Sequence, residues 1–152
     1  MPRSLRILIA PTSFKGSLSA RDACDIIERA LRDAAPPLDL SLEIDRCPIG
    51  DGGEGTASIL AEAFGGGARR ATVPGPLDNE SIEVEWFRLE RLADAPMLAS
   101  ALGVDPGPEP AAIFDAAEIG GLPRVPTGRR DPGRISTQGI GRLIEIARAD
   151  GC

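Results

Sequence analysis

The sequence predicts an α/β protein: a Rossmann-like layered parallel sheet flanked by helices, followed by the beginning of a second α/β domain. Strand-like and helix-like hydrophobic patterns alternate over the first 65 residues, and polar or glycine-rich loops follow the strand-like segments. This alternation favours parallel strands, because a crossover helix returns the chain to the same end of the sheet. A proline- and glycine-rich turn at 74–76 separates the two predicted domains, residues 1–74 and 75–152.

The first strand and helix are predicted from one apolar run and one apolar stripe. Residues 5–10 are almost continuously apolar, as parallel strands covered on both faces tend to be. Ser19 is suited to cap a helix, and apolar residues then recur at helical spacing over 23–34. Pro36 and Pro37 end this helix.

The next elements continue the alternation. Residues 38–44 alternate apolar and polar side chains, which predicts a strand with one solvent-facing side. A second helix is expected over 57–64 and is ended by three glycines. Two further strand-like runs occupy 69–73 and 82–89.

The remaining segment is less regular. Residues 90–110 contain four prolines and predict an irregular excursion, while 111–116 is strand-like and 123–134 is a loop rich in proline and arginine. An amphipathic helix is expected over 140–147. Because a strand normally follows such a helix in an alternating α/β chain, we expect the sequence to be cut off.

Composition excludes several classes of function. The formal charge of −6 argues against a nucleic-acid partner, and the absence of histidine removes histidine bases, Ser-His-Asp triads and histidine metal ligands. The three cysteines are scattered without CxxC spacing, which favours a reducing cytoplasm. No apolar run is long enough for a signal-peptide core or a membrane span, so no membrane partner is expected.

The segment Gly50–Thr56 places two carboxylates among four glycines between a predicted strand and a predicted helix. Glycines allow close backbone approach, and the amides of a helix's first turn suit an anion, so Gly52, Gly53 and Glu54 are candidate substrate-binding residues. An ordinary tight turn, with Glu54 favouring the helix dipole, explains the segment equally well.

Lys15 is the only lysine in the chain and follows the first predicted strand, beside Ser13. Open α/β sheets bind ligands at the carboxyl ends of their strands, so Lys15 and Asp51 are expected to share one crevice. There Lys15 would hold an anion, and Asp51 would accept a hydroxyl proton or bind Mg²⁺. The alternative is a solvated loop lysine.

A third candidate segment precedes the last predicted helix. Ser136, Thr137 and Gly139 could bind an anion there, although ordinary N-capping accounts for the hydroxyls equally well. Asp115, near the end of a predicted strand, joins Asp51 as a candidate metal ligand. Trp86 is expected in the core.

Three segments resemble the bacterial glycerate kinase family in their order and spacing: Ala10–Leu18, Gly50–Thr56 and Gly75–Leu77. The resemblance runs from Leu5 to Cys152. It implies ATP-dependent phosphorylation of D-glycerate with Mg²⁺, and hence glycerate and ATP as partners. A homodimer is one candidate assembly.

The chain departs from the family pattern at several positions. Thr12 stands where the family usually has an aspartate, Gly50 where it has an alanine, and Asp115 where it has a glutamate. Members of the family are also more than twice as long. We therefore expect an incomplete amino-terminal portion without kinase activity by itself. The alternative is a non-catalytic binder of a small carboxylate or phosphate, or a partner subunit.

Overall fold

The computed structural model describes residues 3–152, which form two compact units. The first unit extends to Asp51 and the second runs from Gly52 to Cys152. The domain boundary predicted at 74–75 differs from this division between the compact units, and the two predicted domains remain a prediction. The two units do not divide at 74–75 because residues 67–74 pair with residues 81–88 in one sheet.

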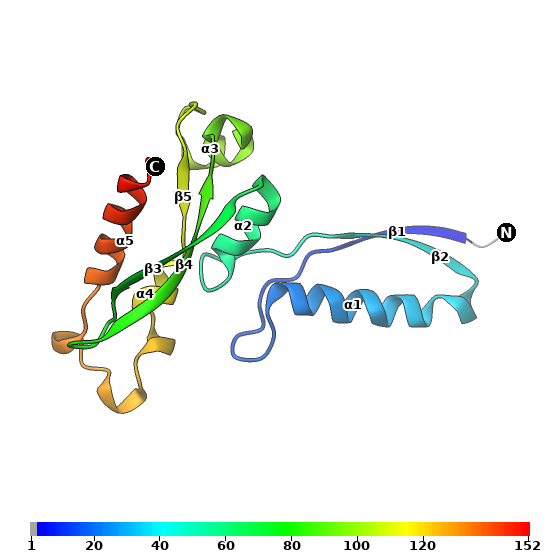
Figure 1. The fold of residues 1–152 in the computed structure, drawn as a ribbon. Coiled ribbons are helices and arrows are strands. Elements are labelled where there is room, and N and C mark those ends of the chain that lie inside the picture. Colours follow the sequence, from blue (N-terminus) through cyan, green and yellow to red (C-terminus); the bar gives the residue numbers. More distant parts are fainter. Residues whose placement is uncertain (1–2) are drawn as a thin grey trace. The chain divides into compact units, whose positions relative to one another are not determined.

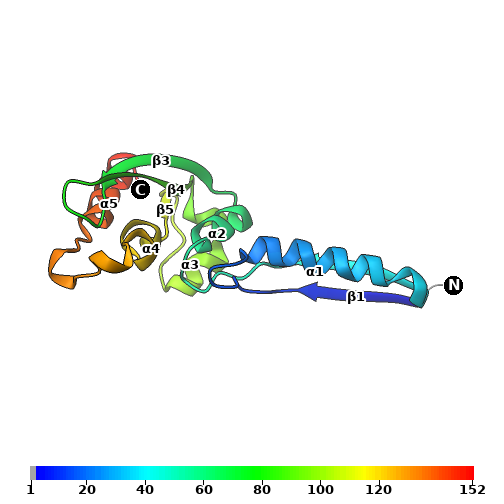
Figure 2. The ribbon, with the colours of Figure 1, turned by 90° about the horizontal axis from the view of Figure 1, so that it is seen from below.

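The first unit is a single βαβ arrangement (Figure 2). β1 (Arg3–Ile9) and β2 (Leu40–Arg46) are parallel, and α1 (Ala20–Ala34) connects them. Ser19 caps α1 as predicted, since its hydroxyl accepts the amide of Asp22 at 3.1 Å. The predicted strand, helix and parallel strand are thus confirmed for this pair.

The first unit is less buried than the apolar pattern predicted. Leu5 is 46% exposed and Leu8 66% exposed, and Ile9 is the buried hydrophobic residue of β1. Ile26 and Ile27 of α1 are also exposed. The physical reason is that β1 pairs with β2 alone among residues 3–152, and one helix covers only part of two strands.

The second unit is built on an antiparallel sheet with the order β3-β4-β5 (Figure 1). Its strands are β3 (Gly67–Pro74), β4 (Ser81–Leu89) and β5 (Ala111–Ile113). Its α-helices are α2 (Thr56–Phe64), α3 (Pro96–Leu102), α4 (Ala116–Gly120) and α5 (Gln138–Ala149). The described protein is therefore α/β, with one parallel and one antiparallel sheet, and Rossmann-like layering of the whole remains a prediction.

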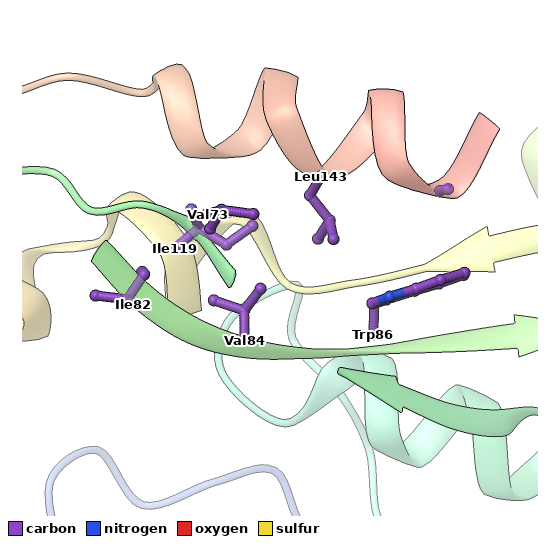
Figure 3. Close-up of a cluster of buried hydrophobic side chains, with 7 residues drawn as sticks. Val73, Ile82, Val84, Trp86, Ile119 and Leu143 are labelled. Atoms are coloured by element: carbon purple, nitrogen blue, oxygen red, sulfur yellow. The ribbon is translucent and has the colours of Figure 1, made fainter. Parts of the chain in front are cut away.

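The main core lies between β4 and the helices α4 and α5 (Figure 3). Trp86 is 2% exposed and belongs to this core, as expected. In Figure 3, α5 lies on one side of β4 and α2 on the other. A second cluster of Leu89, Ala95 and Leu98 includes Phe64 from α2 at its margin. The main cluster consists of Val73, Ile82, Val84, Trp86, Ile119, Leu143 and Ala147.

The predicted irregular segment contains a short helix. Pro96 occupies the first turn of α3, where a missing N–H costs no helical hydrogen bond, and Gly103 ends the helix with a φ of 68°. The strand expected over 111–116 ends earlier, at Ile113, because α4 begins at Ala116. Across residues 3–152, every helix is too short or too polar to cross a membrane.

Candidate functional site

The two predicted ligand-binding loops begin side by side within the first unit. Pairing between β1 and β2 continues past both strands, since Cys47 donates its amide to the carbonyl of Ile9 at 2.8 Å. The amide of Ile49 likewise donates to the carbonyl of Pro11 at 2.9 Å. Both loops therefore leave the same end of the parallel sheet, as the shared-crevice prediction requires.

Lys15 lies at the tip of a tight turn. The amide of Phe14 donates to the carbonyl of Leu18 at 2.9 Å, and Gly16 completes the turn with a φ of 76°. The lysine side chain is exposed, while Ser13 is partly buried. Convergence of Lys15 and Asp51 on one ligand remains a prediction.

The glycine-rich segment folds back onto the first turn of α2. The amide of Gly52 donates to Oγ1 of Thr56 at 3.0 Å, and the amide of Thr56 donates to the carbonyl of Gly53 at 3.2 Å. Gly52 and Gly55 have φ values of 88° and 84°, a region that favours glycine. The glycines thus permit the tight loop that the sequence indicated.

Asp115 reaches this loop from a distant part of the chain. Its Oδ2 accepts the amide of Gly55 at 2.8 Å, and its Oδ1 accepts the amide of Ala57 at 2.9 Å. The residue is only 8% exposed. The amides of Gly55 and Ala57, at the start of the helix where an anionic ligand was considered, are therefore bound by the protein's own carboxylate.

Burial sets the electrostatics around Asp115. Burial raises the pKa of Asp115, and the amides of Ala57 and Gly55 partly offset that effect. Burial also raises the pKa of Glu118, and the negative charges of Asp115 and Glu54 raise it further, while Arg124 and the amide of Gly55 partly offset these effects. Glu118 was not predicted as a site residue, since the sequence indicated a strand over 111–116 and not the helix α4 on which Glu118 lies.

A metal role for Asp115 gains no support from its contacts, because both carboxylate oxygens already accept backbone amides. In the part of the chain that the structure describes, no three carboxylate or thiol groups gather to hold a metal ion. The metal-binding roles of Asp51 and Asp115 therefore remain predictions.

The third candidate segment serves the local structure. Oγ of Ser136 accepts the amide of Gln138 at 3.1 Å, and Thr137 occupies the N-cap position of α5. Gly139 is buried, and a Cβ there would overlap the carbonyl oxygen of Pro74. A hollow of about 380 Å³ beside Ser136 and Gln138 is lined mainly by the β3–β4 turn. Substrate binding by Ser136, Thr137 and Gly139 remains a prediction.

The fold and the first unit's paired loops define the class of protein: an α/β chain whose parallel strands lead into polar loops at one end of the sheet. Comparison with known protein families identifies the chain more specifically. A model of the glycerate kinase family matches residues 7–152, and the chain belongs to this family.

Individual relatives agree with this assignment. The chain is 31% identical to a glycerate kinase of Neisseria meningitidis serogroup B, over 92% of the chain and 31% of the relative. It is 33% identical to glycerate 2-kinase of Escherichia coli K12, over 97% of the chain and 33% of the relative. A crystal structure described as glycerate kinase 2 of Salmonella typhimurium LT2 matches with a TM-score of 0.63 and 30% identity, over 95% of the chain and 33% of that structure. The chain thus spans about a third of the length of these relatives.

Proposed function

We propose that this chain forms the amino-terminal, substrate-binding part of an ATP-dependent glycerate kinase, and that phosphorylation of D-glycerate requires further polypeptide. The family match over residues 7–152 carries this proposal, because it includes both predicted ligand-binding loops. The need for further polypeptide follows from coverage of about a third of the relatives. We also propose a cytoplasmic location, for which the three free cysteines are the support.

Lys15 and Asp51 have complementary roles in this proposal. Phosphoryl transfer requires an anchored substrate and a hydroxyl that can lose its proton. The Lys15 ammonium pairs with the glycerate carboxylate, beside Ser13. Asp51 accepts the proton of the attacking hydroxyl or holds Mg²⁺. The common origin of both loops at one sheet end supports this arrangement.

Asp51 suits Mg²⁺ better than Asp115 does. Mg²⁺ is commonly held by one or two protein carboxylates together with substrate phosphates, so a single exposed carboxylate is a sufficient protein contribution. Asp51 is exposed, whereas the oxygens of Asp115 face backbone amides in a buried position. A bound Mg²⁺ would neutralise charge on the phosphates of ATP.

Binding of D-glycerate to the 152-residue chain tests the proposed site. Calorimetry should detect binding, and both Lys15→Ala and Asp51→Asn should weaken it about tenfold to a hundredfold, the loss of about 1.5–3 kcal/mol expected for a charge-assisted contact. Arg91→Ala, which removes an exposed cation in the second unit, is the control and should leave the affinity unchanged. Wild-type affinity in both site variants would refute the residue assignments.

A coupled assay of ATP consumption with D-glycerate tests whether further polypeptide is needed. The isolated chain should show no turnover above background. Sustained turnover would refute the requirement for further polypeptide while leaving the family assignment unchanged.

A further inference from the structure

We infer that Asp115 is a positioning residue that holds the glycine-rich loop, Gly52–Ala57, in the conformation presented to substrate. The loop's contact with substrate rests on the proposed function, whereas its attachment to Asp115 is visible in the structure. The first turn of α2 lacks a capping side chain of its own. Gly55 is its N-cap residue and has no side chain, so the first amides of the helix need an acceptor from elsewhere.

Asp115 supplies that acceptor instead of capping its own helix. It occupies the N-cap position of α4, where an aspartate normally accepts an amide of the helix it precedes. Its side chain makes no such bond to α4. Both oxygens are used on the start of α2, at 2.8 Å from the amide nitrogen of Gly55 and 2.9 Å from that of Ala57.

The contact restrains the loop at a residue that is already closely fixed. The carbonyl of Gly55 accepts the hydroxyl of Ser58 at 2.9 Å, while its amide is bound by Asp115. Both backbone polar groups of Gly55 are therefore held, with φ at 84°. Gly52 closes the other end of the loop on Thr56. Without Asp115, the Ala57 amide would lose its acceptor and the Gly55 amide would keep only its weaker contact with Glu118. The loop would then gain conformations that compete with the bound one.

The same contact decides where a substrate anion can bind. The N-terminus of α2 carries a partial positive charge that would attract an anionic ligand. Asp115 already occupies this position with a carboxylate of the protein itself. We therefore expect the amides of Gly55 and Ala57 to be unavailable to a substrate anion, and the glycine-rich loop to contribute its shape instead.

Nuclear magnetic resonance of the wild-type chain tests the contact without a mutation. The amide protons of Gly55 and Ala57 should shift with pH, with the same midpoint as the side-chain carboxyl carbon of Asp115. Glu54 and Glu118 are the other carboxylates near Asp115, and Glu118 faces both Arg124 and the amide of Gly55. Asp105→Asn, which removes an exposed carboxylate from the α3–β5 loop, is therefore the control. In Asp105→Asn the three signals should still titrate together. Independent titration of the two amides and Asp115 would overturn the inference.

Asp115→Asn tests the consequence for the loop. It should abolish the common titration and accelerate hydrogen exchange at the amides of Gly55 and Ala57 at least tenfold, while Asp105→Asn leaves their exchange near the wild-type rate. Asp115→Glu, which restores the charge with one more methylene, should recover part of the protection. Wild-type exchange at both amides in Asp115→Asn would overturn the inference.

Glycerate titrations separate this inference from the proposed function. If the wild type binds glycerate, Asp115→Asn should bind it at least threefold more weakly, and Asp115→Glu should recover part of the loss. Unchanged affinity in Asp115→Asn, with loop protection lost, would overturn the positioning role. Failure of the wild type to bind glycerate, with the common titration intact, would overturn the proposed substrate site and the loop's presentation to substrate, but not the attachment of the loop to Asp115.

Discussion

At the scale of single residues, three carboxyl groups lie near the start of α2, and two of them are partly or fully buried. Asp115 and Glu118 are both on or next to α4, and Glu54 precedes α2. Burial raises the pKa values of Asp115 and Glu118. Their folded-state pKa values therefore lie above those of the unfolded chain, so folding disfavours their charged forms.

This arrangement predicts a pH dependence of stability. A carboxyl group whose folded pKa is raised contributes stability below its unfolded pKa, about 4, and loses that contribution as pH rises through its folded value. For the wild type, Asp115 and Glu118 should therefore lower the free energy of unfolding as pH increases above about 4. Urea denaturation from pH 4 to 7 measures the effect.

Variants isolate the source of this dependence. Asp115→Asn should make the fall in unfolding free energy between pH 4 and 7 smaller than in the wild type, even though the variant is less stable overall. Asp105→Asn removes an exposed carboxylate from the α3–β5 loop and should keep the wild-type profile. An identical pH profile in Asp115→Asn and the wild type would contradict the prediction.

At the scale of elements, α5 contains two glycines with opposite surroundings. A Cβ at Gly139 would overlap the carbonyl oxygen of Pro74 and lie 2.8 Å from Cγ2 of Ile119. A Cβ at Gly141 would meet nothing within 4 Å. Gly139 therefore allows the start of α5 to approach the end of β3, whereas Gly141 is a solvent-exposed interruption of the helix.

Alanine substitutions should consequently change stability in opposite directions. Gly139→Ala should destabilise the protein by about 1–3 kcal/mol, because neither backbone nor packed helix can move freely. Gly141→Ala should stabilise it by about 0.5–1 kcal/mol, because alanine loses less backbone entropy in a helix. Thermal and urea unfolding measure both changes. Stabilisation by Gly139→Ala would show that α5 does not pack against β3 as described.

Local sequence patterns predicted the elements better than their pairing. Ser19 identified the start of α1, and three glycines identified the end of α2, because capping depends on neighbouring residues. Ile82, Val84 and Trp86 alternate as a strand should, yet alternation does not determine whether its partners are parallel or antiparallel.

The candidate site was predictable to a similar extent. The motifs identified the loops and the family, because they are contiguous in sequence. The link from Asp115 to Gly55 was not predictable, since the two residues are 60 positions apart and the local pattern indicated only that Asp115 lies near the end of a strand. Long-range side-chain contacts of this kind require the tertiary structure.

At the scale of the whole molecule, the two units differ in how well they bury apolar side chains. Among residues 3–51, the buried hydrophobic side chains are that of Ile9 and the small ones of Ala20, Ala23, Cys24 and Ala35. The second unit contains a core with Trp86 and Leu143 among its members. Since apolar burial is the main favourable term in folding, the first unit should be locally less stable.

Hydrogen exchange followed by mass spectrometry should reveal this difference. Peptides from β1, α1 and β2 should exchange before peptides from β3, β4 and α5, because a two-stranded sheet with one helix opens at lower free-energy cost. Leu143→Ala should destabilise the second unit by about 2–5 kcal/mol and accelerate exchange there. The first unit should keep its wild-type exchange rates if the units open separately. Equal protection in both units, lost together in Leu143→Ala, would instead show one cooperative folding unit and contradict the prediction.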